Sequence, residues 1–196
     1  MNMTFKFFFA CFFCFALTLL SGCGGGLFTA VPKLTPAEKE KADQILADNG
    51  KNAILHYLQN PGGNPDQDAV LKYIKYFVSQ GADVNARRER HLGIHDTPLY
   101  VAAQRRYLQV CRFLVSKGAD LNVRDDYGRT LLHLAVDDVY TLGEGSLFAV
   151  EVLMNVGADS NVKDNTGKTP RERAIEANKS YRNEYLGAII SHPDLK

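Results

Sequence analysis

Cysteine is scarce in this sequence, and its few cysteines are poorly placed for a disulfide or a metal site. The chain has 196 residues and 4 cysteines. Cys11 and Cys14 have a C-x-x-C spacing, but both lie in an apolar N-terminal segment, where this spacing does not indicate metal or redox chemistry. Beyond Cys23 the only cysteine is Cys111, and the apolar pattern at Val110–Leu114 indicates a small core residue rather than a nucleophile. The folded part must therefore gain its stability from packing, without an internal disulfide.

An excess of either charge is also missing. The chain has 23 Lys and Arg against 22 Asp and Glu. Lys6 is the only charged side chain before Cys23, so the remainder holds 22 basic and 22 acidic residues. Domains that bind nucleic acid usually carry a basic excess. The composition therefore gives no indication of a nucleic acid partner.

Recognisable catalytic motifs are lacking as well. The sequence has no G-x-S-x-G elbow, no glycine-rich phosphate loop before a helix and no metalloprotease pattern. His56 and His192 are isolated, and no second ligand pair is spaced to complete a metal site with His91, His95 and Asp96. We therefore expect no enzyme activity, no cofactor and no metal.

The chain begins with an apolar run that is too short to cross a membrane. Residues 7–20 carry no charge and follow the positive Lys6 and amino terminus. A helix of this length cannot span about 30 Å of hydrocarbon, whereas a positive start followed by such a run is typical of a secretory signal peptide. Gly24–Gly26 end the run at once, which disfavours a retained anchor helix.

The residues Leu20-Ser21-Gly22-Cys23 resemble the lipobox of bacterial lipoproteins. The resemblance implies that residues 1–22 are a signal peptide and that Cys23 becomes the first mature residue, with lipid on its sulfur. Acyl chains contribute roughly 0.8 kcal/mol per buried methylene, so two or three chains anchor a domain durably. Gly24 at the next position implies, by the same resemblance, the outer membrane of a Gram-negative cell, facing the periplasm. The alternative is an ordinary secretory signal that ends at a cysteine by chance.

Two short signatures repeat along the rest of the chain. The first occurs at spacings of 37 and 39 residues: Gly81-Ala82-Asp83-Val84-Asn85, Gly118-Ala119-Asp120-Leu121-Asn122 and Gly157-Ala158-Asp159-Ser160-Asn161. Each copy follows an apolar helical pattern, so its glycine falls where a helix ends and predicts a residue with positive φ. The second signature, T-P-L-H-x-A, has three copies: Thr97-Pro98-Leu99-Tyr100-Val101-Ala102-Ala103, Thr130-Leu131-Leu132-His133-Leu134-Ala135-Val136 and a degraded one at Thr169-Pro170.

Together these signatures resemble the ankyrin repeat, whose period is about 33 residues. The resemblance covers about residues 68–190 and implies an all-α solenoid of stacked helix pairs with short β-hairpin loops. It also implies a structural role for His133. Both spacings exceed the period of the family, so we expect insertions at Arg88–His95 and Tyr140–Ser146. Inserted loops on one face of a solenoid often serve binding, although neutral drift of a loop accounts for them equally well.

Several helices are predicted before the first repeated signature. Thr35 and Glu38 form a capping box, which predicts a helix to about Leu46. Further helices are expected over residues 52–59 and 68–80.

These patterns divide the mature chain into three parts. Residues 23–34 form a lipidated tether, and residues 35–80 form an N-terminal helical cap with a diverged first repeat. Residues 81–196 hold the ankyrin repeats, and a helix over 181–191 is expected to cap them, because a solenoid must shield its last apolar face.

The resemblance also locates a binding strip, because ankyrin proteins bind along their hairpin tips and the exposed ends of each first helix. The corresponding residues are Arg88, Arg90, Gln104 and Arg105 in the second repeat, Arg124, Asp126, Tyr127, Arg129, Asp137 and Asp138 in the third, and Lys163 and Lys168 in the fourth. Arginines gather in the second repeat and the two adjacent aspartates in the third. We expect such a bipolar strip to orient a partner, and we expect Arg88, Arg90 and Arg105 to point away from the stack. The alternative for any one of them is a solvated charged surface.

Two classes of function follow. The first is a lipid-anchored periplasmic ankyrin module that binds another, unidentified protein, as an immunity or inhibitor protein against a toxin. This reading rests on similarity at the level of the fold. The second is a scaffold that holds an envelope enzyme or cell-wall factor at the membrane. We expect a monomer, attached to the membrane through lipid on Cys23.

Overall fold

The computed structural model describes residues 33–63, 65–87, 97–139, 144–181 and 184–193. The chain divides into two compact units, Met1–Ala30 and Val31–Lys196, and all described residues belong to the second. The expected signal peptide, Cys23 and the insertion at Arg88–His95 lie outside the described residues and stay predictions. Within the described part, no helix is long and apolar enough to cross a bilayer.

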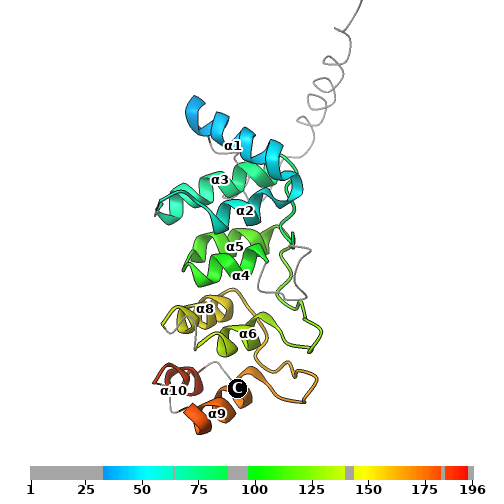
Figure 1. Ribbon diagram of the computed structural model, residues 1–196, viewed down its shortest axis with the longest axis vertical. Coiled ribbons are helices and arrows are strands. Elements are labelled where there is room, and N and C mark those ends of the chain that lie inside the picture. Colours follow the sequence, from blue (N-terminus) through cyan, green and yellow to red (C-terminus); the bar gives the residue numbers. More distant parts are fainter. Residues whose placement is uncertain (1–32, 64, 88–96, 140–143, 182–183, 194–196) are drawn as a thin grey trace, which may run out of the picture. The chain divides into compact units, whose positions relative to one another are not determined.

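The described residues form helices, turns and loops, with no β-strand among them. The elements are α1 (Pro36–Asn49), the 3₁₀ turn η1 (Gly50–Asn52), α2 (Ala53–Gln59), α3 (Gln67–Ser79), α4 (Pro98–Gln104), α5 (Leu108–Ser116), α6 (Leu131–Asp137), α8 (Glu144–Asn155), α9 (Pro170–Tyr181) and α10 (Glu184–Ile190). Figure 1 shows them stacked as successive pairs within this unit, which confirms the predicted all-α solenoid.

Among the described residues, four helix pairs form four repeats, and α1 covers the first of them. The pairs are α2 with α3, α4 with α5, α6 with α8, and α9 with α10. Between the first and second repeats, α2 packs on α4 and α3 on α5. Between the third and fourth, α6 packs on α9 and α8 on α10. The middle junction differs, because the first helix α4 packs on the second helix α8.

The helices begin where the sequence predicts caps. The N–H of Thr35 donates to Glu38 Oε2 at 2.7 Å, and the N–H of Glu38 donates to Thr35 Oγ1 at 3.3 Å, so the capping box is confirmed. Thr97 caps α4, with Pro98 at its first position, where a missing N–H costs no hydrogen bond. α1 continues past the expected Leu46 and ends only at Gly50, which has a φ of 53°.

The repeated glycines end helices as predicted. Gly81, Gly118 and Gly157 have φ values of 86°, 89° and 96°. Each lies just past a helix whose last carbonyls accept the following N–H groups, as in the bonds from Ala82 to Phe77 at 3.0 Å and from Ala119 to Leu114 at 2.9 Å. The predicted helix ends after α3, α5 and α8, each at a glycine with positive φ, are therefore confirmed.

Two expected boundaries are corrected by the structure. Residues Glu144–Ser146 were assigned to an insertion, but they form the first turn of α8. Ser146 is fully buried and its hydroxyl donates to the carbonyl of Ala135, which offsets the weak helix propensity of this polar, glycine-containing segment. The expected capping helix begins at Glu184 rather than at Tyr181, which is the last residue of α9.

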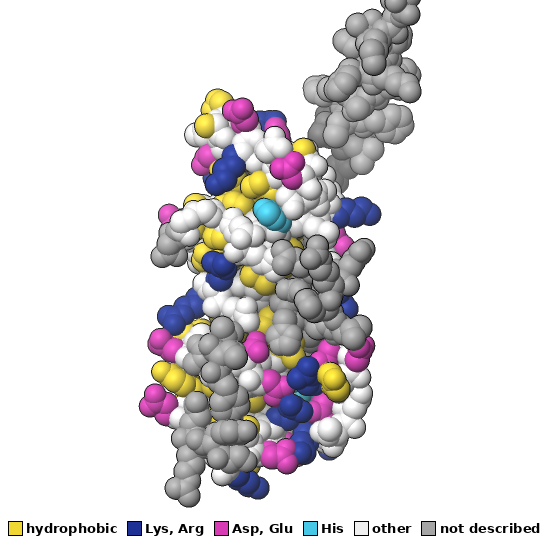
Figure 2. All heavy atoms as spheres, in the orientation of Figure 1, with side chains coloured by type: hydrophobic (Ala, Val, Ile, Leu, Met, Phe, Trp, Pro, Cys, Tyr) yellow, Lys and Arg dark blue, Asp and Glu magenta, His cyan; other side chains and the backbone are white. Residues whose placement is uncertain are grey.

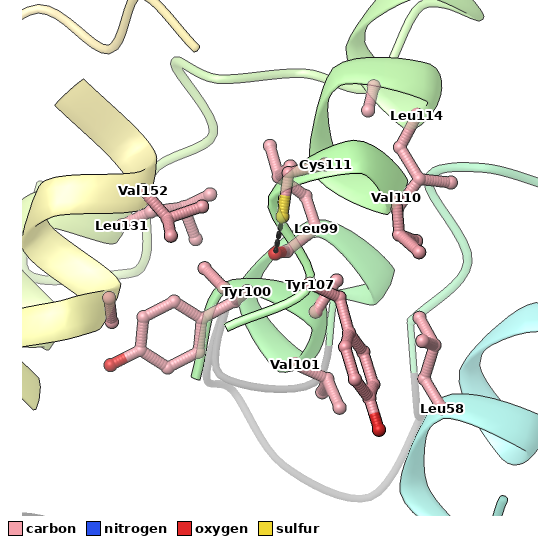
Figure 3. Close-up of a cluster of buried hydrophobic side chains, with 14 of the residues drawn as sticks. Leu58, Leu99, Tyr100, Val101, Tyr107, Val110, Cys111, Leu114, Leu131 and Val152 are labelled. Carbon is pink, nitrogen blue, oxygen red and sulfur yellow. Dashed lines mark hydrogen bonds between the residues drawn. The ribbon is translucent and has the colours of Figure 1, made fainter. Parts of the chain in front are cut away.

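A continuous hydrophobic core runs through the stack. Figure 3 shows its middle, where Leu58 from α2 and Val152 from α8 lie on either side of the α4–α5 pair. Cys111 is fully buried there, with its Sγ 3.9 Å from the carbonyl oxygen of Leu99. Burial raises the pKa of this thiol to about 12. The sequence prediction of a core cysteine is thereby confirmed.

Candidate protein-binding surface

The loops that precede α6 and α9 project from the stack as two compact turns. We call residues 124–129 the third finger and residues 163–168 the fourth finger. The N–H of Asp125 donates to the carbonyl of Arg129 at 3.1 Å, and Asp164 makes the same contact in the fourth finger at 2.9 Å. Both fingers are thus closed like the tip of a hairpin, although the described residues around them form no β-ladder.

Each finger is organised around an inward aspartate. Asp125 accepts two backbone N–H groups of its own finger, at 3.0 and 2.8 Å. Asp164 accepts the N–H groups of Thr166 and Lys168, at 2.8 and 3.1 Å, and a hydrogen bond from Arg173 at 2.9 Å. Both carboxylates have side chains that are only 1% exposed. Burial alone would raise the pKa of Asp164, but its hydrogen bonds with Thr166, Lys168 and Arg173 hold that pKa well below its ordinary value.

The two fingers brace one another. The backbone N–H of Asn165 donates to the carbonyl of Tyr127 at 2.9 Å, and its side-chain amide donates to the carbonyl of Asp126 at 3.0 Å. Arg124 Nη1 donates to the carbonyl of Lys163 at 3.0 Å. These three contacts fix the backbone of the third finger against the fourth.

Gly128 allows this close approach. Its φ is 73°, and a Cβ at this position would lie 2.3 Å from Asn165 Oδ1 and 3.0 Å from the backbone nitrogen of Asn165. Because glycine has no Cβ and adopts positive φ readily, it is the residue that this contact requires.

Tyr127 is the exposed aromatic at the tip of the third finger. Its side chain is 69% exposed, the highest exposure of any large hydrophobic side chain among the described residues. The guanidinium carbon of Arg129 lies 5.0 Å from the centroid of the Tyr127 ring, within the range of a cation–π contact. The ring is therefore partly oriented by Arg129 while most of its surface stays open to solvent.

The adjacent aspartates of α6 take part in the stack and do not simply point outward. Asp137 accepts a hydrogen bond from Arg129 at 2.8 Å and several from Arg173, the shortest at 2.9 Å. Asp138 accepts from the Tyr100 hydroxyl at 2.6 Å and from Gln104 at 3.3 Å. These two members of the predicted strip therefore join neighbouring repeats.

The other strip residues divide into three groups. Arg88 and Arg90 lie outside the described residues. Arg105 is exposed and reaches back to the carbonyl of Gln59 at 2.9 Å, while Lys168 forms an ion pair with Glu176. Arg124, Asp126 and Lys163 are exposed at the fingers. Figure 2 shows Lys, Arg, Asp and Glu side chains intermingled over the part of the stack that holds α6 and α9.

His133 is a buried, doubly hydrogen-bonded side chain. Its Nδ1 lies 3.1 Å from the donating N–H of Thr130, and its Nε2 lies 3.0 Å from the carbonyl of Lys168. Burial lowers its pKa below the ordinary value, although the hydrogen bond with Lys168 opposes this shift. These contacts support the structural role expected for His133. In the described part of the chain, no group of three or more His, Cys, Asp or Glu side chains is arranged to hold a metal ion.

The sequence did not point to Arg173 as a component of this surface. Its guanidinium binds Asp137 and Asp164 together and so links the third and fourth repeats. The separation of 36 residues between Arg173 and Asp137 leaves no local signal for this contact. Only the stacking of α6 on α9 brings the two residues together.

Among solved structures, the ankyrin repeat domain of Bcl-3, described as a unique member of the IkappaB protein family, matches with 24% identity and a TM-score of 0.44. The match covers 61% of this chain and 45% of that one, so the chain spans less than half of its length. A search of curated protein sequences gave no match.

The family comparison is more extensive. A family model of ankyrin repeats in three copies matches residues 23–164, well over half of the chain. Ankyrin repeats indicate a protein-interaction module, and their fold is typically a scaffold without catalytic activity. The repeated signatures, the stacked helix pairs and this match agree, and the chain belongs to the ankyrin-repeat family.

Proposed function

We propose that this protein is a lipid-anchored module of the bacterial cell envelope, held at the outer membrane on its periplasmic side, that binds another protein through its fingers. The observation that carries the binding part is the braced pair of fingers. Their backbone is fixed by Asn165 and Arg124, while their tip side chains remain exposed. A rigid surface loses little conformational entropy when a partner binds. Less of the favourable free energy of its contacts is therefore offset by ordering, and the affinity is higher.

The anchor is supported by the sequence. Leu20-Ser21-Gly22-Cys23 follows an uncharged run of signal-peptide length, and lipid on Cys23 would tether the repeats at the membrane surface. Two or more acyl chains give durable attachment, so the repeats need no spanning helix of their own.

Metabolic labelling with a radiolabelled fatty acid tests the anchor. We expect the wild-type chain to take up label and to fractionate with the outer membrane. Cys23→Ser should remove the label and either release the protein or leave it unprocessed. An unlabelled wild-type chain would contradict the proposed anchor. It would not contradict the proposed protein binding, which is tested separately.

Site-specific photo-crosslinking in the producing cell tests protein binding. A photoreactive residue is placed at Thr166, exposed on the fourth finger, and in a matched variant at Arg112, exposed on α5 away from the fingers. We expect the Thr166 variant to capture a discrete protein that the Arg112 variant does not. If neither variant captures a protein, or only Arg112 does, the proposed binding surface is wrong.

Within this function we favour neutralisation of a toxic protein over a scaffold role. The fingers offer one preorganised face, which suits capture of a single partner, as an immunity or inhibitor protein requires. Deleting the gene and exposing the cells to the product of any toxin gene beside it separates the two roles. Loss of viability supports immunity, whereas loss of an envelope enzyme from the membrane fraction supports a scaffold.

A further inference from the structure

Tyr127 has the properties of a binding anchor. It is 69% exposed, although no stability is gained by leaving an aromatic ring in water. Its backbone is held by two contacts, from its own N–H to Asp125 and from Asn165 to its carbonyl. Tyrosine is among the residues that most often dominate binding energy in protein interfaces. A fixed, exposed ring of this kind is best explained by a partner that covers it.

A column of cations is expected at one equivalent position of three successive repeats. Arg87, Arg124 and Lys163 occupy the same position in three successive repeats, each six residues after the glycine that ends a helix. All three side chains are exposed. Equivalent positions of stacked helices are roughly 8 to 10 Å apart, so the column presents positive charge at regular intervals along the fingers.

The acidic groups of the two fingers do not cancel this column at the tips. Asp125 and Asp164 are turned inward, and their side chains are only 1% exposed. Glu176 is paired with Lys168, and Asp126 is the exposed acid of the third finger.

A separate row of acids recurs in three successive repeats. Asp83, Asp120 and Asp159 each accept the N–H of the asparagine two residues later, at 2.8 to 2.9 Å. These acids therefore come before the fingers in each repeat, whereas the cations stand at the first residues of the third and fourth fingers.

We propose that the surface formed by Tyr127, Arg87, Arg124 and Lys163 docks an acidic protein segment, with Tyr127 as the apolar anchor and the three cations facing a row of carboxylates. The proposal rests on the proposed function and names the chemistry of the partner. An aromatic anchor supplies affinity that persists at high salt, because burial of the ring does not depend on screening. The cation column supplies the orientation and a faster association, which salt weakens.

A selection experiment tests the chemistry of the partner. The full chain in detergent micelles is used to select binders from a phage-displayed library of random peptides, with the Tyr127→Ala chain as the counter-selection. We expect the recovered peptides to be rich in Asp and Glu. Neutral or basic peptides, or no enrichment at all, would overturn the proposal.

Variants of the full chain then distinguish the contribution of the Tyr127 ring from that of the cation column. Against the best selected peptide, Tyr127→Ala should raise Kd at least about tenfold, while Tyr127→Phe should stay close to wild type. Lys163→Glu should slow association at low salt, and this effect should shrink at high salt. The matched charge reversal Arg112→Glu on α5 should change neither value. Equal binding by Tyr127→Ala and wild type, or equal effects of Lys163→Glu and Arg112→Glu, would overturn the proposal.

The two proposals fail in different ways. Tyr127 and Lys163 are exposed, so their variants should melt like wild type, and circular dichroism checks this. If the cross-linker at Thr166 captures a protein but the selected peptides are not acidic, the chemistry proposed here is wrong and the proposed binding function stands. If the cross-linker captures no protein, the binding function itself is wrong.

Discussion

Replacing Gly128 by alanine should destabilise the stack more than the same change at any other repeat glycine. A left-handed backbone costs a non-glycine residue about 1 kcal/mol. At Gly128 the new Cβ would also lie 2.3 Å from Asn165 Oδ1 and 3.0 Å from its backbone nitrogen, so the fourth finger has to shift. Losing the two hydrogen bonds that Asn165 donates to the third finger adds about 1 kcal/mol each. The expected total is roughly 2 to 3 kcal/mol.

Gly118→Ala is the matched control for this measurement. Gly118 has a φ of 89°, and a Cβ added there meets nothing within 4 Å. This variant therefore reports the backbone strain alone, at about 1 kcal/mol. The difference between the two variants isolates the contact between the fingers.

Urea unfolding of a chain that starts at Val31, followed by circular dichroism, measures both variants. The double variant Gly128→Ala with Asn165→Gly removes the clashing side chain and should cost less than the sum of the two single changes. If Gly128→Ala costs no more than Gly118→Ala, the two fingers are not in contact in solution, and the protein has no preorganised surface at the third and fourth fingers.

Three further predictions concern the core. Leu132 is 1% exposed in α6, and Leu132→Ala should lower the free energy of unfolding by about 2 to 5 kcal/mol, measured by the same denaturation. Cys111 is fully buried, and burial raises the pKa of its thiol to about 12. A thiol reagent at neutral pH should therefore label Cys111 only after denaturant unfolds the chain. Rapid labelling of the native chain would show that the core is open. Because burial lowers the pKa of His133 in the folded state, the unfolded chain takes up this proton first, and stability should fall as pH drops below about 6.5. Thermal melts between pH 7.5 and pH 5 should show a smaller decline for His133→Gln than for wild type, and equal declines would contradict this assignment.

The local features of the fold could be predicted from the sequence because they depend on neighbouring residues. Thr35 and Glu38 are three residues apart, and their reciprocal hydrogen bonds require only the first turn of a helix. Gly81, Gly118 and Gly157 each mark a helix end because positive φ is a property of a single residue. Because the signatures recur at nearly regular spacing, these local signals together predict a stack of similar repeats.

The features that the sequence did not predict depend on contacts between residues that are distant in the chain. The first turn of α8 looked like a loop because Gly145 and polar neighbours disfavour a helix, whereas the hydrogen bond from Ser146 to Ala135 is visible only when α6 and α8 pack together. Asp137 looked like a free surface acid because Arg173 lies 36 residues away. The fingers were placed by family resemblance, but their mutual brace through Asn165 follows from the stacking of the third and fourth repeats.

The unusual middle junction, where α4 packs on α8, affects how the protein unfolds. In a linear array each repeat is coupled only to its neighbours, so global cooperativity is set by the weakest coupling. The third and fourth repeats share both helix layers and the hydrogen bonds between their fingers, whereas at the middle junction α4 packs on α8 and donates hydrogen bonds from Tyr100 and Gln104 to Asp138 at the end of α6. We expect this crossed packing to be the place where denaturant first divides the chain into two halves. A partner bound across the third and fourth fingers would raise the melting temperature of the C-terminal half and leave the N-terminal half to unfold on its own.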